Sequence, residues 1–419
     1  MKNSGIEWIG EIPDTWELVR FKDICANKKE VVGSNSADYE RLALTLNGVI
    51  KRPKDDSEGL QPKEFDGYQI IHENDFIFKM IDLQNISTSR VGLSPYTGLV
   101  SPAYIRFVPR KENQYNKFTY YFLMSMYYNC VYNSLGGNGV RSALNATDMG
   151  QFKIPYPSLE AQKKIVSFLE EKFVAVDELI ANQQGQIEKL KEYKQSVITE
   201  AVTKGLDKSA PLKDSGIEWI GEIPAHWIKI KHKVLFKNVS IKGHGDATVL
   251  SLYRDYGVVP KDSRDDNHNV TSLDTDSYKY VQPNDLVINK MKAWSGSIAI
   301  TDYEGIVSPA YYTCKVNYKY ITKRFIHHYL RNKHLVGLYE MYSAGLREGQ
   351  WDLSIDDFQS IEIAIPPTLE EQDAIAKAID EKCDSIDKLI AIKQEKIEKL
   401  QEYKKSLIYE YVTGKKEVV

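Results

Sequence analysis

The 419-residue sequence lacks the marks of several protein classes. It has no run of 18 apolar residues, so we expect no membrane-spanning segment and no membrane partner. The opening MKNSGIEWIG has no apolar core, so we expect no signal peptide. The four cysteines are isolated from one another and from histidine pairs: Cys25, Cys130, Cys314 and Cys383. This spacing excludes a zinc cluster and a disulfide framework, and it fits a reducing cytoplasm.

Catalytic motifs are also absent from the sequence. GGNGV at 136–140 and KGHGD at 242–246 lack the spacing of a phosphate-binding glycine loop. There is no GxSxG, no HExxH and no Asn/Asp-Pro-Pro-aromatic tetrapeptide of the amino-methyltransferase kind. The eight histidines are scattered, and His327–His328 lie in a predicted amphipathic helix. We therefore expect no catalytic residue and no metal ligand set in this chain.

An excess of charge of one sign is missing as well. The formal net charge is −3, from 55 basic and 58 acidic side chains. Residues 1–157 carry 18 of each sign, and residues 211–367 carry 19 of each. This balance argues mildly against a polyanionic partner, although a neutral domain can still gather its basic side chains on one face. The length and the 42% hydrophobic content predict two globular domains.

A long segment is present twice. Residues 158–205 and 368–415 align without a gap at a shift of 210, and neither contains proline. Ser158 and Thr368 are suitable helix N-caps. Apolar residues recur every three or four positions, which predicts two long amphipathic helices: Val176, Ile180, Ile187, Leu190, Val197 and Ala201, then Ile386, Ile390, Ile397, Leu400, Leu407 and Tyr411.

The apolar stripe predicts how these helices are used. A long helix with one apolar stripe needs a partner, and the other copy is the nearest one, so we expect an antiparallel coiled coil. Polar residues interrupt both stripes, at Gln183 and Lys194 and at Lys393 and Lys404. The sequence leaves open whether residues 159–169 form a separate short helix.

A second repeat opens each half of the chain. SGIEWIGEIPDTW at 4–16 returns as SGIEWIGEIPAHW at 215–227. We expect an irregular arm that packs its tryptophans onto a domain core. The prolines that follow the strand-like FKIPYP and IEIAIPP block helix until the N-cap of each long helix.

Between the repeated segments, the two halves differ in sequence but keep the same order of predicted strands and shared motifs. Residues 19–107 read as short strands and turns, as do their counterparts. The halves agree at Asn74–Asp75 and Asn284–Asp285, at Lys79–Met80 and Lys290–Met291, and in VSPAY. The shift falls from 211 to 207 after Met80, so the first half has four extra residues within or near DLQNISTSR. An aromatic helix is expected at 118–134 and at 324–342, packed in the core, and a glycine-containing loop follows each.

These features predict a tandem α+β chain of four segments. The variable domains, largely β with helices, cover 1–157 and 211–367. The helical regions cover 158–210, as a central spacer, and 368–419. If the helices pair antiparallel, a pseudo-two-fold axis relates the halves.

Several motifs combine with this arrangement: GIEWIGEIP at 5–13 and its copy, Leu159–Gln162 and Leu369–Gln372, the two helices, NDLVINKMKAW at 284–294 and VSPAY at 307–311. Together they closely resemble the specificity subunit of type I restriction–modification systems, and the resemblance covers essentially the whole chain. The first half departs from the commoner pattern, because it has KMIDLQNISTSR where the second has KMKAWSGS.

The resemblance implies a function for each segment. Each variable domain would be a target-recognition domain that reads one half of a bipartite double-stranded DNA sequence. The paired helices would space the domains and dock the modification (methyltransferase) subunits. S-adenosylmethionine would be bound by the modification subunit. ATP and Mg²⁺ would belong to the restriction/translocase subunit, which joins through the modification subunits. This chain would bind no cofactor and perform no catalysis.

Candidate DNA-contacting residues follow from side-chain chemistry in the loops. Arginine suits guanine, asparagine or glutamine suits adenine, and lysine suits phosphate. The first domain offers Asn47, Lys51, Arg52, Lys79, Gln84, Asn85, Arg90, Asn138 and Arg141. The second offers Tyr253, Arg254, Lys261, Arg264, Lys290, Lys292, Trp294, Arg347, Gln350 and Trp351.

Two other interpretations compete with this one. A duplicated coiled-coil scaffold without DNA contact fits the balanced charge, but it has no need for two different loop sets. A self-contained nuclease or methyltransferase would need motifs that the sequence lacks.

Overall fold

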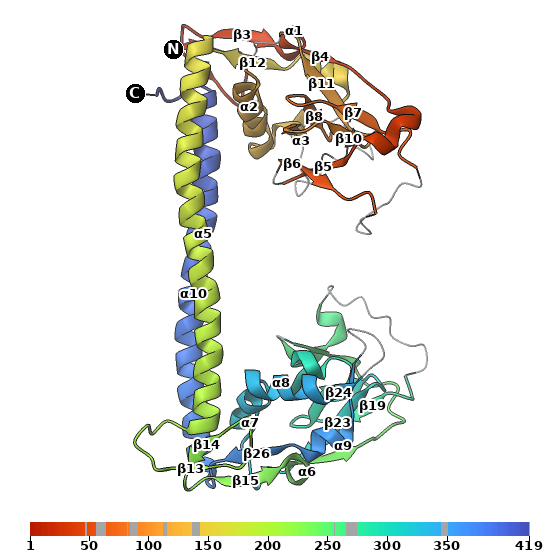
Figure 1. Ribbon diagram of the computed structural model, residues 1–419, viewed down its shortest axis with the longest axis vertical. Helices are drawn as coiled ribbons and strands as arrows, with labels where there is room; N and C mark the ends of the chain where they lie inside the picture. The colour runs from red at the N-terminus through yellow and green to blue at the C-terminus, as the bar shows by residue number, and fades with distance from the viewer. Residues whose placement is uncertain are drawn as a thin grey trace. The chain divides into compact units, whose positions relative to one another are not determined.

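The computed structural model describes residues 1–46, 48–55, 64–81, 83, 91–111, 115–135, 143–254, 256–264, 275–344 and 351–418. The chain forms two compact units. Unit 1 consists of Met1–Gln183 and Glu395–Val419, and unit 2 of Gln184–Gln394. Each unit therefore contains one variable domain and a part of both long helices (Figure 1).

The two repeated segments form long helices. Helix α5 (Leu159–Lys204) has 46 residues and α10 (Leu369–Val412) has 44. Residues 159–169 are continuous with the rest of α5, which settles the question that the sequence left open. Both predicted N-caps are confirmed: the Ser158 hydroxyl accepts from the Ala161 N–H, and the Thr368 hydroxyl from the Glu371 N–H, each at 3.3 Å.

The two helices pair antiparallel within each unit, as the stripe predicts (Figure 1). In unit 1, Lys404 Nζ lies 2.7 Å from Asp177 Oδ1. In unit 2, Lys194 Nζ lies 2.6 Å from Asp387 Oδ2, and Lys393 donates to Gln186. The lysines that interrupt the stripe therefore reach acceptors on the other helix. Stripe residues are buried between the helices, among them Val176, Ile187, Ile386, Ile397 and Leu407.

Unit 1 is built on two four-stranded sheets. The first is antiparallel, in the order β4 (Cys25–Asn27), β11 (Ile105–Pro109), β8 (Phe76–Phe78) and β9 (Val91–Leu93). The second has the order β6 (Gly48–Arg52), β5 (Arg41–Thr45), β10 (Gly98–Val100) and β7 (Gln69–Ile71), and β10 pairs parallel with β5. Smaller elements complete the unit: β1 (Lys2–Asn3) with β2 (Glu11–Ile12), β3 (Glu17–Arg20) with β12 (Lys153–Tyr156), α1 (Phe21–Ile24), η1 (Gly33–Asp38), α2 (Asn116–Tyr128), α3 (Val131–Leu135) and α4 (Ala146–Gly150).

Unit 2 repeats this topology. Its four-stranded sheet has the order β16 (Phe236–Val239), β23 (Tyr311–Val316), β20 (Leu286–Asn289) and β21 (Ile298–Ile300). The pairs β17 (Leu250–Tyr253) with β18 (Gly257–Pro260) and β19 (Lys279–Val281) with β22 (Gly305–Val307) correspond to the second sheet. A parallel bridge from Val249 to Ile306 stands where β5 and β10 pair in unit 1. The predicted tandem α+β repeat is therefore confirmed.

Smaller elements again complete unit 2. The strand pairs are β13 (Leu212–Asp214) with β14 (Glu222–Pro224), β15 (Ile228–Lys231) with β26 (Glu362–Ile365), and β24 (Ser343–Ala344) with β25 (Asp352–Leu353). The helices are α6 (His232–Leu235), η2 (Lys261–Ser263), η3 (Ala293–Ser295), α7 (Lys323–Leu330), α8 (Lys333–Tyr342) and α9 (Ile355–Ser360).

The opening repeat is largely the irregular arm that we expected, because residues 4–10 and 215–221 form turns without strand. Only the short strands β2 and β14 lie within it, and they pair with β1 and β13 just before it. Its aromatic residues anchor it, as predicted: Trp16 and Trp227 are buried in the unit cores. Gly205, just after α5, has a positive φ of 74°, and a Cβ there would lie 3.3 Å from the Trp227 ring. A glycine therefore lets the chain turn directly against the tryptophan.

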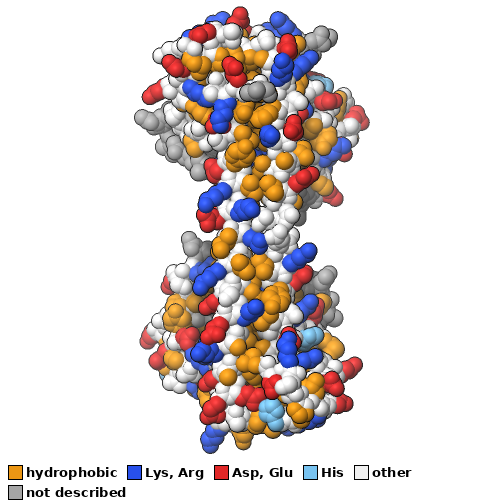
Figure 2. Space-filling view, turned by 90° about the vertical axis from the view of Figure 1, so that its left-hand side faces the viewer, with side chains coloured by type: hydrophobic (Ala, Val, Ile, Leu, Met, Phe, Trp, Pro, Cys, Tyr) orange, Lys and Arg blue, Asp and Glu red, His pale blue; other side chains and the backbone are white. Residues whose placement is uncertain are grey.

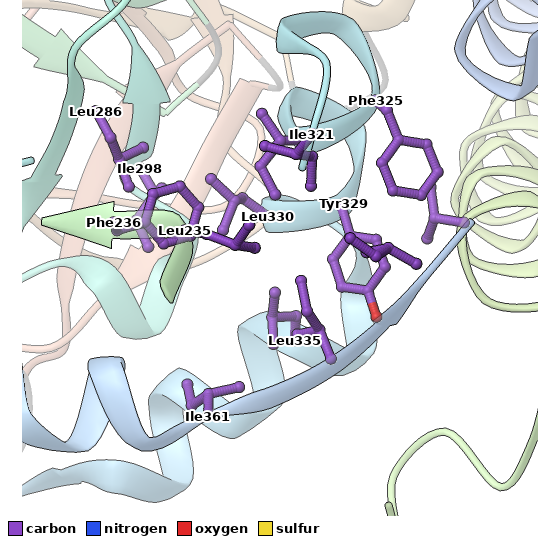
Figure 3. Close-up of a cluster of buried hydrophobic side chains, with 14 of the residues drawn as sticks. Leu235, Phe236, Leu286, Ile298, Ile321, Phe325, Tyr329, Leu330, Leu335 and Ile361 are labelled. Atoms are coloured by element: carbon purple, nitrogen blue, oxygen red, sulfur yellow. The ribbon is translucent and has the colours of Figure 1, made fainter. Parts of the chain in front are cut away.

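Each core joins sheet and helices, and Figure 3 shows that of unit 2. Strand β20 and helix α7 face one another across it through Leu286 and Leu330, both at most 1% exposed. Ala201 and Val202 at the end of α5 belong to the same core. The labelled side chains are Leu235, Phe236, Leu286, Ile298, Ile321, Phe325, Tyr329, Leu330, Leu335 and Ile361.

The predicted aromatic helix is wrong in one respect, because two helices replace it in each unit. In unit 1 the break between α2 and α3 falls at Cys130, whose φ is 53°. In unit 2 it falls at Asn332, whose side chain accepts from the N–H groups of His334 and Leu335 and so caps α8. Asparagine competes with helix by bonding to nearby backbone, and the apolar spacing does not report this. The aromatic residues are core residues as expected, for example Phe118 and Phe325.

The shared Asn-Asp pairs are structural turns. Both asparagines have positive φ, 67° for Asn74 and 76° for Asn284, a conformation that asparagine tolerates better than most residues. Each following aspartate is buried and paired with a cation. Asp75 accepts from Arg106 Nε at 2.7 Å, and Asp285 accepts from Lys315 Nζ at 2.8 Å.

The shared glutamines Gln162 and Gln372 fix the joint between each domain and its long helix. Both are buried. Gln162 Nε2 donates to the Pro157 carbonyl at 2.9 Å, and Gln372 Nε2 donates to the Pro366 carbonyl at 3.0 Å. The same side chain thus ties each helix back to the strand that leads into it.

Candidate nucleic-acid interface

The turn after β20 brings predicted contact residues of unit 2 together. Lys292 and Trp294 lie on the η3 turn, which ends at Gly296 with a φ of 86°. The Trp294 ring meets the Trp351 ring edge-on at 5.7 Å, and its Nε1–H donates to the Met291 carbonyl at 2.9 Å. Residues 57 positions apart in sequence therefore form one half-exposed aromatic pair.

Lys290 stands at the base of this turn. Its Nζ lies 2.7 Å from Asp352 Oδ2, and this hydrogen bond raises the pKa of Lys290. The Leu353 N–H also donates to the Lys290 carbonyl at 3.0 Å. The turn is thereby tied to β25, while the exposed Lys292 points its charge to solvent.

A second group lies around the β17–β18 hairpin. Tyr253 ends β17 and the exposed Arg254 follows it. The Arg264 guanidinium lies 5.5 Å from the Tyr253 ring centroid and 3.9 Å from that of Tyr256. Lys261 lies on η2 beside them. Arginine held on tyrosine faces keeps its N–H donors at the rim, where a nucleic acid can accept from them.

In unit 1 the described candidates are fewer. Lys51 and Arg52 lie on β6, and Lys79 follows β8. Lys51 Nζ lies 2.6 Å from Glu40 and 5.2 Å from the Tyr96 ring centroid, and the hydrogen bond to Glu40 raises the pKa of Lys51. Each unit therefore presents a lysine held by one acidic residue near an aromatic surface.

Several predicted residues lie outside the described residues, as does most of the DLQNISTSR segment. They are Asn47, Gln84, Asn85, Arg90, Asn138, Arg141, Arg347 and Gln350. Contact with DNA stays a prediction for every candidate, described or not.

Sequence reasoning did not identify the residues that orient these cations. Glu40, Asp352 and Tyr256 carry no motif, and their role depends on strand pairing that brings distant segments together. The sequence offered one signal, because Asp352, the acidic residue next to Trp351, is a possible ion-pair partner for Lys290.

His328, the second of the two adjacent histidines on α7, connects this helix to α10. His328 Nε2 lies 2.7 Å from Asp380 Oδ1, and Arg324 also pairs with Asp380. This tie between α7 and α10 corresponds to the pair of Lys117 with Glu170 in unit 1, at 2.6 Å. Burial lowers the pKa of His328. The contact between α7 and α10 therefore has an equivalent in unit 1 that uses no histidine, and we interpret it as structural.

Two other kinds of site are absent from the described residues. Over the residues that the structure describes, no three His, Cys, Asp or Glu side chains are grouped so that they could hold a metal ion. In the same part of the chain, no helix combines the length and apolar character needed to cross a bilayer. The groups above offer hydrogen-bond donors, positive charge and flat aromatic surface, which suit base edges and phosphates.

Comparisons with known proteins agree with this chemistry. A family model described as type I restriction modification DNA specificity domain matches residues 13–192 and 235–402. A putative type I restriction enzyme MjaX specificity subunit of Methanocaldococcus jannaschii is 26% identical over 406 residues, covering 88% of this chain and 87% of the relative.

Two solved structures match most of the length of the chain. One, described as the structural basis of complex assembly and conformational transition of the type I R-M system, has a TM-score of 0.62 at 14% identity. That match covers 96% of this chain and 98% of the other. The HsdS subunit of Thermoanaerobacter tengcongensis has a TM-score of 0.47 at 15% identity, over 96% and 98% of the two chains. The first of these shows the shared fold.

Proposed function

The chain belongs to the family of type I restriction modification DNA specificity domains, and on that premise we propose how its parts divide the work. Each unit reads one half of a bipartite double-stranded DNA target. The paired helices set the distance between the half-sites and dock the modification subunits. The chain itself catalyses nothing and binds no cofactor. S-adenosylmethionine is bound by the modification subunit, and ATP and Mg²⁺ by the restriction subunit.

One observation carries this proposal. The two units share a topology but present different side chains at equivalent places. After β20, unit 2 presents Lys292 with the Trp294–Trp351 pair. After the matching strand β8, unit 1 has the buried Met80 where unit 2 has the exposed Met291. A common frame with different surface chemistry is what reading two different half-sites requires, because base edges are distinguished by donor, acceptor and apolar groups.

Methylation mapping tests the recognition function. Long-read mapping of DNA from cells that carry this chain and its modification partner is expected to show one bipartite methylated motif, which is lost when the chain is deleted. Replacing residues 1–157 by the corresponding domain of another family member is expected to change one half of the motif only. A methylome that does not depend on the chain would contradict the proposal and favour the scaffold interpretation.

Exposed apolar residues on the long helices support the docking role. Figure 2 shows hydrophobic side chains along these helices with lysine and arginine beside them. Leu179 and Leu389 are equivalent in the repeat and each 48% exposed. Tyr193 and Tyr403 are also equivalent and each 49% exposed. Unit 1 thus holds one such leucine and one such tyrosine, and unit 2 holds the same, which suits two copies of one partner.

A paired charge substitution tests docking. The variant Leu179→Asp with Leu389→Asp is expected to lose co-purification with the modification subunit and to keep DNA binding, because both side chains are exposed and a buried charge would oppose the interface. Lys189→Asp with Lys399→Asp, at equivalent exposed positions elsewhere on the helices, is the matched control. Full co-purification of the leucine variant would refute this docking surface.

An activity assay of the purified chain alone tests the alternative that the protein is itself an enzyme. It is expected to be inert toward DNA with S-adenosylmethionine or with Mg²⁺. Turnover by the isolated chain would show that it has a catalytic site of its own.

A further inference from the structure

Unit 2 contains a cleft of about 1670 Å³ beside its long helix. Residues 191–204 of α5 form one wall. Helix α7, the start of α8 and the turn at Gly296 form the other, and Arg254 lies at its edge. The basic side chains of the lining are Lys191, Lys194, Lys204, Arg254, Arg331 and Lys333, against the acidic Glu192, Glu200 and Asp387.

Among the described residues, three of these six cations have no acidic partner. Asp387 pairs with Lys194 at 2.6 Å, and Lys191 pairs with Glu188 at 2.9 Å. Within the described part of the chain, no carboxylate pairs with Lys204, Arg254 or Lys333, and all three are exposed. Unpaired cations gathered in one concave surface repel one another, so this arrangement costs stability unless an anion fills it.

Part of the positive charge of the cleft is specific to unit 2 and has no equivalent in unit 1. Helices α2 and α7 align at a shift of 207, which places Phe118 on Phe325. At that shift, Met124 of unit 1 stands where unit 2 has Arg331, and Met126 stands where it has Lys333. Arg331 and Lys333 therefore have no basic equivalent in unit 1, so the shared frame does not require them.

We propose that this cleft binds the sugar–phosphate backbone of double-stranded DNA next to the half-site that unit 2 reads. The inference rests on the function proposed above and adds an asymmetry to it. Duplex DNA presents a negative charge about every 1.7 Å along its axis, and lysine and arginine neutralise it without reading sequence. Arg254 lies both in the cleft and beside the Arg264–Tyr256 group, so the cleft adjoins the candidate base-reading loops.

The test uses the full chain and the salt dependence of its DNA binding. The variant Lys204→Gln with Lys333→Gln removes two cleft charges, both on exposed side chains whose loss leaves the core intact. Lys237→Gln with Lys377→Gln, at two exposed positions outside the cleft, is the matched control. Each loss of a phosphate contact lowers the slope of log K against log salt by about 0.9.

We therefore expect the cleft variant to lose about 1.8 from the slope. The ratio of wild-type to variant affinity for DNA is then about 12-fold smaller at 200 mM salt than at 50 mM salt. The loss is equal on the mapped motif and on a scrambled duplex, the methylated motif is unchanged, and Lys204→Arg with Lys333→Arg restores binding.

An unchanged slope, in a chain on which the methylome does depend, overturns the cleft assignment and leaves the recognition function standing. Loss of the modification subunit from the variant complex at an unchanged DNA slope also overturns it, because the cleft then holds an acidic protein segment. A methylome independent of the chain removes the proposed function itself.

Discussion

Replacing His232 by phenylalanine is expected to remove much of the acid sensitivity of this protein. His232 begins α6 and is completely buried between Phe236 and Phe358, with ring centroids 5.3 and 4.6 Å away. Its Nδ1–H donates to the Phe358 carbonyl at 3.0 Å, while Nε2 is buried without a partner among the described residues. Protonation would place an unpaired charged N–H there, and burial accordingly lowers the pKa of His232 to about 3.

The sign and size of the effect follow from linkage. The folded pKa is depressed relative to the ordinary 6.5, so the unfolded chain binds more protons between about pH 6.5 and pH 3. The contribution of neutral His232 is therefore fully present above pH 6.5 and is lost as the pH falls through this window. Because the folded form binds almost no proton at pH 5, the free energy of unfolding is about 2 kcal/mol lower there than at pH 7 from this group alone.

Urea titrations of the wild-type chain and of His232→Phe at pH 7 and pH 5 measure the difference. The repeat itself indicates that phenylalanine fits, because Phe21 holds the equivalent place in α1 and is fully buried. Other titrating groups cancel when the pH dependence of the variant is subtracted from that of wild type. The same pH dependence in both proteins would refute the argument.

Two further predictions concern unit 1 and the long helices. Arg106→Leu leaves the buried Asp75 without the Nε partner that lies 2.7 Å away, so we expect the free energy of unfolding in urea to fall by about 3–5 kcal/mol. Adding Asp75→Asn is expected to recover part of this loss. A loss below about 1 kcal/mol would show that the pair contributes little. Inserting four residues after Gln183 of α5, and four after Gln394 of α10 to keep the pairing, lengthens each helix by about 6 Å. At about 3.4 Å per base pair, the unread spacer in the methylated motif is expected to grow by one or two base pairs, and an unchanged motif in a folded variant would contradict the spacer role.

The repeated elements were predictable because their signals are local. Each long helix can be read from its own sequence, which has a serine or threonine N-cap, no proline and a regular apolar stripe. The strong match between Asn74–Asp75 and Asn284–Asp285 was visible too, but its meaning was not. Only the fold shows that each aspartate is buried against a cation from a distant strand.

The candidate site was predictable in chemistry but not in arrangement. Lys290, Trp294 and Trp351 were named from residue type, and strand pairing then brings them together. The cleft of unit 2 could not be foreseen, since Lys204 and Lys333 come from a helix end and a helix start 129 residues apart. The break at Asn332 was missed because its side chain bonds to backbone, a choice that apolar spacing does not record.

The joints made by Gln162 and Gln372 also affect how domains can be exchanged by recombination. Each glutamine bonds to a carbonyl five or six residues before it, and Gln372 also bonds to Tyr320 and Thr322 of the same domain, so each joint is made with the domain that precedes the helix. A genetic crossover further along the repeated helix, where the two copies are nearly identical in sequence, would carry a domain and its joint over together. New pairings of domains can then arise by recombination in a single step, with no compensating mutation at the junction.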